Sequence, residues 1–404
     1  MALGRRSKGN GSTGMLGWLR NFGPAWLVMI AGIDVASIIT ALQSGASWGY
    51  RMVFIMLALT VPLFLIQDAA GRLGIASGLG LGDAIRKRFG RRVALVAAVP
   101  MGLSDFVAYV AEYAGVAIGL KLLGLPVVLG LLAVFVLHLL VVARKQYRYA
   151  EMVLLPVSFV LVAVIVTSAF VFHFDIGRFL VLGLSPIQPY GNPSFDFLLA
   201  ASVGATVMPW MLFFHSGADS RRKKDPKNLK NERIEALLGA VVSEVLTAFI
   251  VVVGLRLASG SGIINIEVLS NAIAFFGPYA SIVMGLGFVF AGFLALVVIS
   301  LGSAWGVLEA LGTDSQSSFL KVYLAESVPA LVLVLFITNY IQLVLHIMVL
   351  FTIIIVPSLY FLGRLVSDEK VMNGHALGRM GTWLFWLASL FIVLGGILGI
   401  LALI

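Results

Sequence analysis

The stretch Gly32-Ile33-Asp34-Val35-Ala36-Ser37 decides the fold, because it interrupts an apolar run near the N-terminus. Asp34 is the one carboxylate within residues 24–44, and an ionised group at membrane depth costs about 2.5–3.5 kcal/mol on insertion scales. Glycine, β-branched residues and serine are poor helix formers, so the sequence predicts a broken helix here. Such a break makes backbone carbonyls available beside the carboxylate.

A second apolar segment carries a comparable interruption, Ala205-Thr206-Val207-Met208-Pro209. Proline has no backbone N–H, so a helical hydrogen bond is lost at this point. Two interrupted hydrophobic helices in corresponding places of two repeats indicate the midplane binding site of a transporter. The sequence therefore predicts a protein that moves a small cation across a membrane.

The composition is that of a membrane protein. The chain is 60% hydrophobic and 12% charged, whereas soluble domains average about 25% charged residues. The absence of cysteine excludes disulfides, thiolate metal sites and iron–sulfur clusters. Apolar stretches long enough to span a bilayer recur along the whole length. We predict eleven spans, at about residues 24–44, 51–70, 93–120, 123–143, 150–172, 196–217, 234–257, 273–308, 320–338, 340–363 and 380–404.

The net charge of +9 is distributed asymmetrically. With the N-terminus inside, all of the 28 lysines and arginines fall in cytoplasmic segments except Arg51, Lys121, Arg178 and Arg256. Cytoplasmic loops are enriched in these residues, so this pattern predicts an inside N-terminus and an outside C-terminus. The positive charge is thus explained by the membrane topology, and no nucleic-acid partner is expected. The predicted location is the inner or plasma membrane, with many spans.

The predicted fold is an all-α polytopic membrane protein built from two halves. Five spans per half is an odd number, so the halves must have opposite topology, which is the inverted-repeat arrangement. The predicted segments are a basic cytoplasmic N-terminus at 1–22, a first five-helix repeat at 23–172, an external loop at 173–195, a second repeat at 196–363, and a cytoplasmic loop with an eleventh helix at 364–404.

Several motifs resemble the Nramp family of divalent-metal transporters. They include Gly204-Ala205-Thr206-Val207-Met208-Pro209, His215-Ser216 after it, Arg72-Leu73-Gly74-Ile75-Ala76-Ser77-Gly78, and Gln43-Ser44-Gly45-Ala46. The resemblance covers nearly the whole chain. It implies a LeuT-type fold, with five plus five helices in inverted repeats and one extra helix, and import of Mn²⁺ or Fe²⁺, usually with protons.

The resemblance also implies a set of metal ligands: Asp34, Ser37 at the family's asparagine position, Met208, and the backbone carbonyls of Ala31 and Ala205. Each side chain has another interpretation: Asp34 can cap unwound backbone, Ser37 can cap its own helix, and Met208 can fill an apolar gap. A thioether favours softer transition ions, whereas Mg²⁺ and Ca²⁺ prefer oxygen ligands. The expected shell is mixed oxygen and sulfur, completed by water.

The sequence differs from the family's motifs at several positions, including those that the resemblance assigns to proton transport. The family's Asp-Pro-Gly-Asn is Asp34-Val35-Ala36-Ser37 here, and its Met-Pro-His ends in Trp210. An acidic pair three residues apart becomes Tyr109 and Glu112, and an arginine pair aligns with Val322-Tyr323. These missing groups belong to the family's proton route. We therefore expect proton coupling to be altered or absent.

Other titratable groups lie within predicted spans. Asp105, Tyr109 and Glu112 are spaced i, i+4 and i+7, so they share one helix face. Glu244 and Glu326 lie in later spans. Each acid can be read as a proton-relay or gating site, as half of a buried ion pair, or as a group that faces a wet cavity.

The histidines have less specific interpretations. His215 is expected near the cytoplasmic mouth of the second broken helix. There it could shuttle protons, or it could bond the last carbonyls of the helix. His138 and His346 stand alone in apolar runs and are expected to be packing residues.

Three functions remain open from the sequence. The first is a transporter of Mn²⁺ or Fe²⁺, and the second is a related transporter of Mg²⁺ or another small cation. The third is a membrane-embedded enzyme or a receptor, but no nucleophile elbow or His-Glu-x-x-His motif is present. We expect no enzyme activity, no cofactor and no obligate protein partner. The expected partners are the lipid bilayer and a divalent metal ion as substrate.

Overall fold

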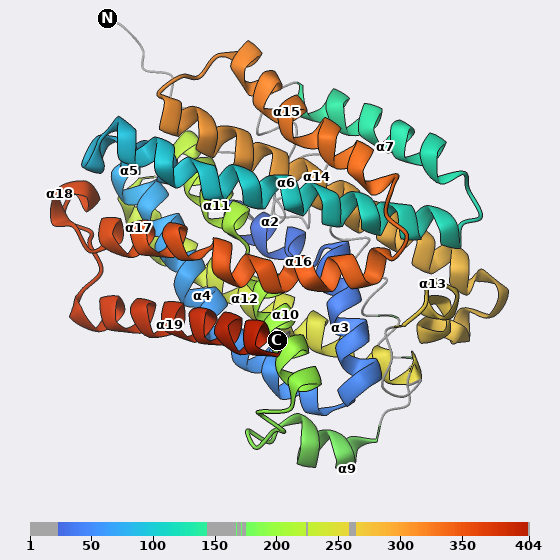
Figure 1. Cartoon of the computed structure of the whole chain (residues 1–404). Coiled ribbons are helices and arrows are strands. Elements are labelled where there is room, and N and C mark those ends of the chain that lie inside the picture. Colours follow the sequence, from blue (N-terminus) through green and yellow to red (C-terminus); the bar gives the residue numbers. More distant parts are fainter. Residues whose placement is uncertain are drawn as a thin grey trace, which may run out of the picture.

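The computed structural model describes residues 23–143, 175–223, 225–257 and 264–402, together with Thr167 and Val171. No strand occurs in these ranges, and the predicted all-α class is confirmed. The helices, shown in Figure 1, are α2 (Pro24–Ala31), α3 (Val35–Trp48), α4 (Arg51–Ser77), α5 (Leu81–Phe89), α6 (Arg91–Leu122), α7 (Val127–Val142), α9 (Ile176–Arg178), α10 (Pro193–Thr206), α11 (Pro209–Arg222), α12 (Leu229–Gly254), α13 (Ile266–Leu269), α14 (Ala280–Leu311), α15 (Gln316–Val334), α16 (Tyr340–Ile354), α17 (Val356–Val366), α18 (Glu369–Met372) and α19 (Arg379–Leu401).

The membrane spans follow the predicted ones closely. Within the described residues, eight helical segments are long and apolar enough to cross a bilayer, or nine if α2 and α3 form one bent span. Helix α7 has 16 residues, fewer than the roughly 20 that a full span needs. The predicted span at 150–172 lies outside the described residues except for Thr167 and Val171. The total of eleven, the inside N-terminus and the segment boundaries therefore remain predictions.

Two predicted spans differ from the structure in detail, and proline explains both differences. The span predicted at 273–308 becomes a regular α-helix only at Ala280, because the preceding turn contains Gly277 at a φ of 56° and Pro278. The span predicted at 340–363 divides at Ile355 into α16 and α17, and Pro357 stands in the first turn of α17. A proline removes a backbone donor, so it ends one helix and suits the start of the next.

The broken helices form the centre of the molecule. All eight residues of α2 are buried, and 94% of the most apolar stretch of the α10–α11 span is buried. A helix that is apolar on every side must lie inside a protein or a membrane. Helix α12 packs against α2, α3 and α4, and α4 packs against α11. Helices α6 and α14 pack along each other and contact α3 and α11. In Figure 1, α7, α15 and α19 lie at the periphery.

The outer helices present apolar side chains to their surroundings. Val96 on α6, Leu129 on α7 and Leu387 on α19 are 71%, 67% and 63% exposed. A soluble protein rarely leaves such large contiguous apolar surfaces in water, but a lipid bilayer solvates them well. The outer faces of these helices therefore face lipid, as expected of a multi-pass integral membrane protein.

Glycines allow the central helices to approach their neighbours closely. A Cβ at Gly204 on α10 would overlap the Met348 carbonyl on α16, and one at Gly45 on α3 would overlap the Val251 carbonyl on α12. Small residues at helix interfaces are the usual means of close packing in membranes. These two contacts fix the broken helices against α16 and α12.

Gly204→Ala should lower the thermal stability of the purified protein, because the new methyl group meets a backbone carbonyl that cannot rotate away. We expect a cost of about 1–3 kcal/mol, as for other overpacked interiors. Gly287→Ala is the matched control, since a Cβ there meets nothing within 4 Å. Scanning fluorimetry of both variants measures the effect, and equal melting temperatures would contradict this packing.

Candidate metal centre

Both predicted helix breaks are present. Residues 32–34 separate α2 from α3, and the two segments are bent by 51°. Val207 and Met208 separate α10 from α11, and both have extended backbone, with φ of −125° and −100°. The breaks bring non-helical backbone from both halves of the chain into the buried centre.

The second break leaves the carbonyl of Ala205 without its helical donor. In a continuous helix that carbonyl would accept from the N–H four residues later, but this residue is Pro209, which has none. The Ser37 hydroxyl donates to the Ala205 oxygen instead, at 3.3 Å. This hydrogen bond joins the two broken helices directly.

The first break likewise leaves the carbonyl of Ala31 without its helical hydrogen-bond donor. Its helical donor would be the N–H of Val35, which donates to Oε2 of Glu112 at 3.4 Å instead. Glu112 belongs to α6, so a third helix is tied to the break. Two carbonyls, one at each break, are thus released from helical hydrogen bonding, as an ion site built from unwound helices requires.

Asp34 uses its two carboxylate oxygens differently. Oδ1 caps α3 by accepting the N–H of Ser37 at 2.7 Å, and Oδ2 is buried. The carboxyl group also interacts with the side chains of Ser37 and Glu112. The residue is 1% exposed, and the charge of Glu112 acts on it from α6. A buried oxygen of this kind, near a second carboxylate, requires a proton or a cation to be stable. The capping and ligand interpretations are therefore compatible.

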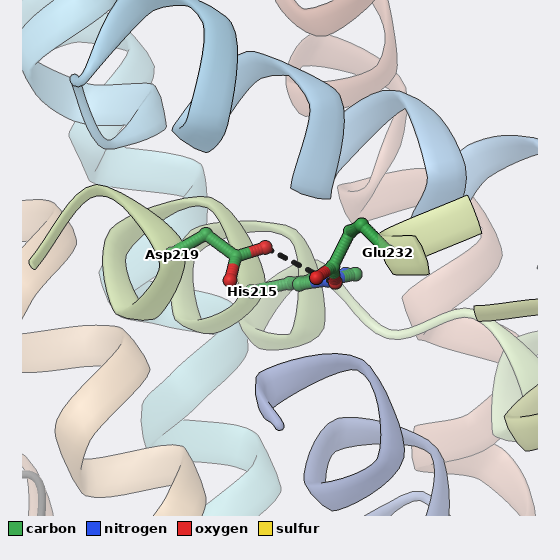
Figure 2. Close-up of side chains that lie close together, drawn as sticks. All are labelled: His215, Asp219 and Glu232. Atoms are coloured by element: carbon green, nitrogen blue, oxygen red, sulfur yellow. Dashed lines mark hydrogen bonds and ion pairs between the residues drawn. The ribbon is translucent and has the colours of Figure 1, made fainter. Parts of the chain in front are cut away.

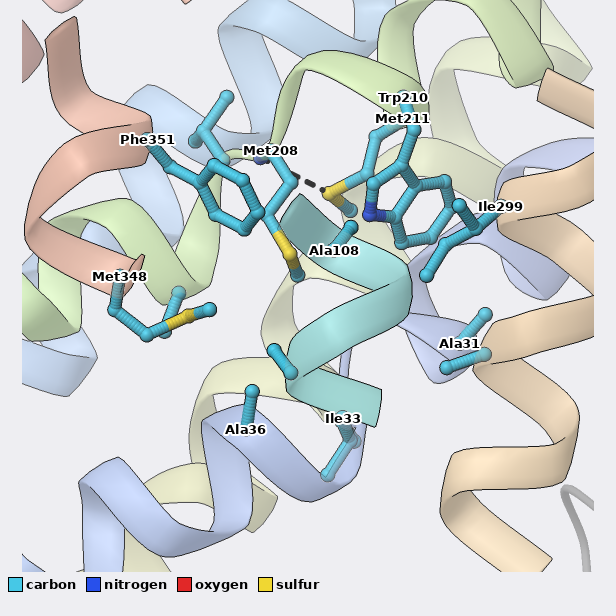
Figure 3. Close-up of a cluster of buried hydrophobic side chains, with 14 of the residues drawn as sticks. Ala31, Ile33, Ala36, Ala108, Met208, Trp210, Met211, Ile299, Met348 and Phe351 are labelled. Atoms are coloured by element: carbon cyan, nitrogen blue, oxygen red, sulfur yellow. Dashed lines mark hydrogen bonds between the residues drawn. The ribbon is translucent and has the colours of Figure 1, made fainter. Parts of the chain in front are cut away.

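Two thioethers lie at the second break. Met208 is 1% exposed and its side chain lies in an apolar cluster with Met348 and Phe351 of α16 (Figure 3). Met211 Sδ accepts the Met208 N–H at 3.4 Å, and its methyl group lies against Gly32 in the first break. Sequence reasoning missed Met211, although its i+3 spacing from Met208 places it one helical turn further on.

A small cavity lies beside the breaks, with about 10 Å³ open to water-sized molecules, which is room for about one water. Ser37, Ala205, Met211 and Glu244 are among its lining residues, but Asp34 and Met208 are not. The structure therefore brings Glu244 of α12 to the centre. The remaining lining residues are Gly32, Thr40, Ala41, Met56, Ser202, Thr206, Ser243 and Thr247.

Tyr109 belongs to a separate buried network. Its hydroxyl donates to Ser300 Oγ at 2.7 Å, and that oxygen lies 2.7 Å from His138 Nε2. The hydroxyl of Tyr323 lies 3.2 Å from His138 Nδ1. His138 is buried, as expected of a packing residue, and it also links α6, α7, α14 and α15 by hydrogen bonds. Tyr109 and Tyr323 are both held in this network.

Asp105 is not at the helix breaks. It lies on α6 about two turns before Glu112, and its carboxylate is buried and interacts with Ser303. The charge of Glu326 on α15 acts on it, and Glu326 in turn accepts a 2.6 Å hydrogen bond from Ser303. Trp210 is also buried, near Ile299 in Figure 3, and its indole N–H has no acceptor within the described residues.

His215 does not cap its helix; its ring nitrogens contact side chains from other helices. Its Nδ1 lies 3.0 Å from Gln67 Oε1, and its Nε2 lies 2.8 Å from Glu232 Oε1. The alternative in which it bonds the last carbonyls of its helix is therefore wrong, because side chains from α4 and α12 occupy both ring nitrogens.

Comparison with known proteins agrees with this geometry. Residues 25–402 match the family described as Natural resistance-associated macrophage protein-like (Nramp). The chain is 27% identical over 399 residues to a Bacillus subtilis protein named divalent metal cation transporter MntH, covering 94% of this chain and 91% of that protein. It is 27% identical over 395 residues to the protein of the same name in Mycobacterium tuberculosis, covering 92% and 89%.

Solved structures show the same fold. A variant of the Eremococcus coleocola manganese transporter aligns with a TM-score of 0.81 at 20% identity, over 97% of this chain and 88% of that one. MhsT in complex with L-phenylalanine aligns with a TM-score of 0.63 at 10% identity, over 96% and 98%. The predicted LeuT-type fold is confirmed. Because the family match extends over nearly the whole chain, this protein belongs to the Nramp family.

Proposed function

We propose that this protein is a secondary transporter that imports divalent transition-metal cations, Mn²⁺ or Fe²⁺ first, by alternating access. The observation that carries the proposal is the carboxylate of Asp34, which is 1% exposed, lies at a break between two helices and faces the carboxyl group of Glu112. The names of the Bacillus and Mycobacterium relatives support a divalent-metal substrate.

The proposed ligands are Asp34 Oδ2, the carbonyls of Ala31 and Ala205, and the thioether of Met208. The broken helices supply the two carbonyls, because neither carbonyl accepts its helical hydrogen bond. Ser37 stands at the family's asparagine position with a shorter side chain, and it already donates to Ala205. We therefore assign Ser37 a contact through water rather than a direct bond to the ion.

The thioethers favour a transition metal over Mg²⁺. Sulfur binds softer ions, whereas Mg²⁺ and Ca²⁺ take oxygen ligands and gain little from it. Met208 and Met211 both lie at the second break, and each is 1% exposed. A Mg²⁺ site would place two apolar sulfur side chains where oxygen donors are needed. The family and its named relatives are membrane transporters, which supports transport rather than catalysis.

The centre is closed to both sides of the membrane in this conformation, since Asp34 and Met208 are each 1% exposed. Transport requires that the ion reach Asp34 from one side and leave to the other. In the proposed cycle, the packing around α3 and α11 loosens alternately on the two sides, as in other transporters with broken helices.

We further propose that proton coupling is weak or absent. Trp210 replaces a titratable histidine with an indole that only donates, and Tyr109 is a poor relay at neutral pH, with an ordinary pKa near 10. Glu112 is the remaining acid beside Asp34, and it accepts the N–H of Val35. Asp105 interacts with Glu326, about two helical turns from Glu112.

Asp34→Asn should abolish metal uptake into proteoliposomes while the protein stays folded. Asparagine can still cap α3, so the variant removes the charge and spares the cap. Asp196→Asn is the matched control, because Asp196 is a buried acid on α10 whose carboxylate accepts the Gly191 N–H away from the breaks. Uptake at the wild-type rate in the Asp34→Asn variant would reject the assigned site.

Met208→Ala should lower the affinity for Cd²⁺ more than the affinity for Ca²⁺, because only the softer ion gains from sulfur. The ratio of the two affinities should therefore fall. Calorimetric titration of both ions measures the ratio. The same titration of Met211→Ala shows which of the two thioethers at the break contributes to the preference for Cd²⁺. An unchanged Cd²⁺-to-Ca²⁺ ratio in Met208→Ala would mean that Met208 only fills space.

Metal uptake at a clamped membrane potential should cause little or no internal acidification. The measurement uses a pH indicator trapped in proteoliposomes, with metal entry followed in parallel. Acidification that tracks metal entry and disappears in Glu112→Gln would show that a proton path survives through that residue, contrary to the proposal.

A further inference from the structure

A second group of metal-binding side chains lies further along α11. His215 and Asp219 come from α11, and Glu232 comes from the first turn of α12 (Figure 2). His215 Nε2 lies 2.8 Å from Glu232 Oε1 and 3.4 Å from Asp219 Oδ2, and the three atoms all lie within 4.8 Å of one another. The side chains are 0%, 2% and 0% exposed for His215, Glu232 and Asp219.

The helix places this group in line with the first centre. His215 follows Met208 by seven residues and Asp219 by eleven, so all three lie on one face of α11. At 1.5 Å per residue, His215 is about 10 Å from Met208 along the helix. One face of α11 thus carries a thioether at the break and nitrogen and oxygen donors two turns later, toward its predicted cytoplasmic end.

Gln67 fixes which ring nitrogen faces the carboxylates. Its Oε1 lies 3.0 Å from Nδ1 of His215, and an amide oxygen only accepts, so Nδ1 carries the proton. In the neutral ring, the Nε2 lone pair then points at two carboxylate oxygens. An amide or carbonyl on the distal nitrogen is the usual way in which a metal-binding histidine is oriented. In this tautomer, three atoms able to bind a metal converge.

The cluster offers formal negative charge to a divalent ion. With a neutral imidazole, the carboxylates of Asp219 and Glu232 carry two negative charges, which one divalent ion can balance. Asp68 on α4 lies close by and is 7% exposed, and the charges of Arg72 and Arg233 act on it. Buried charges that are left unbalanced are costly.

The neighbouring helix α4 packs closely on the donor atoms. A Cβ on Gly71 of α4 would lie 2.7 Å from His215 Nε2 and 3.2 Å from Asp219 Oδ2. A residue larger than glycine at this position of α4 would therefore clash with the atoms that would hold an ion. The 2.8 and 3.4 Å separations between donors also fit the edges of a shell with bonds of about 2.0–2.2 Å to nitrogen and oxygen.

We propose that His215, Asp219 and Glu232 form a second divalent-metal site, which takes a transition ion such as Zn²⁺ or Mn²⁺ through one nitrogen and two carboxylate donors. Its metal binding stands on this geometry alone. Its role, as a station for the transported ion between Asp34 and the cytoplasm, rests on the proposed function.

The test is Zn²⁺ binding to the purified full-length protein in detergent, measured by equilibrium dialysis and elemental analysis. Asp34→Asn should retain one tightly bound Zn²⁺ per chain, and adding Asp219→Asn should remove it. Asp68→Asn is the matched control, because it removes the same charge from the same region without removing a ligand. It should retain the ion.

X-ray absorption of the Zn²⁺-loaded Asp34→Asn protein identifies the ligands. We expect nitrogen and oxygen at about 2.0–2.2 Å, with imidazole scattering and no sulfur. Glu232→Gln is a second variant in case Asp219→Asn fails to fold, and it should weaken Zn²⁺ binding at least tenfold. Loss of all tightly bound Zn²⁺ in Asp34→Asn alone, sulfur in its spectrum, or unchanged binding in the folded Asp219→Asn or Glu232→Gln background would overturn the second site. None of these results bears on transport through Asp34, which the uptake assay tests separately.

Discussion

The structure depends on one buried carboxylate. Asp34 lies at the end of a helix whose residues are all buried, and only one of its oxygens is used to cap α3. A charge so placed is unfavourable unless a cation or proton balances the second oxygen. The helix break at Asp34 also changes the hydrogen bonds around it, because the Val35 N–H donates to Glu112 and the Ser37 hydroxyl donates to Ala205. One electrostatic requirement thus links three helices.

Helix α11 carries further potential metal ligands at a distance from the helix breaks. It begins at the second break with Met208 and Pro209, and its later turns carry His215 and Asp219 on the same face as Met208. The first centre offers oxygen and sulfur, whereas the second offers oxygen and nitrogen. An ion moving along this face would exchange a soft ligand for an imidazole, and both sets of ligands suit a transition metal better than Mg²⁺.

Local signals in the sequence predicted the features that depend on local chemistry. Glycine and β-branched residues around Asp34 and the proline after Met208 act on their own helices, so both breaks were predictable. The position of Met211 and the partners of His215 were not, because they depend on how α11 meets α4 and α12. Spacing alone also could not separate Glu112, which reaches the break, from Asp105, which interacts with Glu326. The irregular turn at Ser270–Tyr279 contains Gly277 and Pro278, which are local signals that the span predicted at 273–308 did not take into account.

The most direct test of the central claim is to locate a bound ion in the protein. Crystals soaked in Mn²⁺ and measured at the manganese absorption edge reveal the ion by anomalous scattering. The account predicts a peak between the two helix breaks, bonded to Asp34 Oδ2 and adjacent to the Met208 sulfur. A protein that transports Mn²⁺ but shows no peak there, with Asp34 Oδ2 hydrogen-bonded to protein alone, would contradict it.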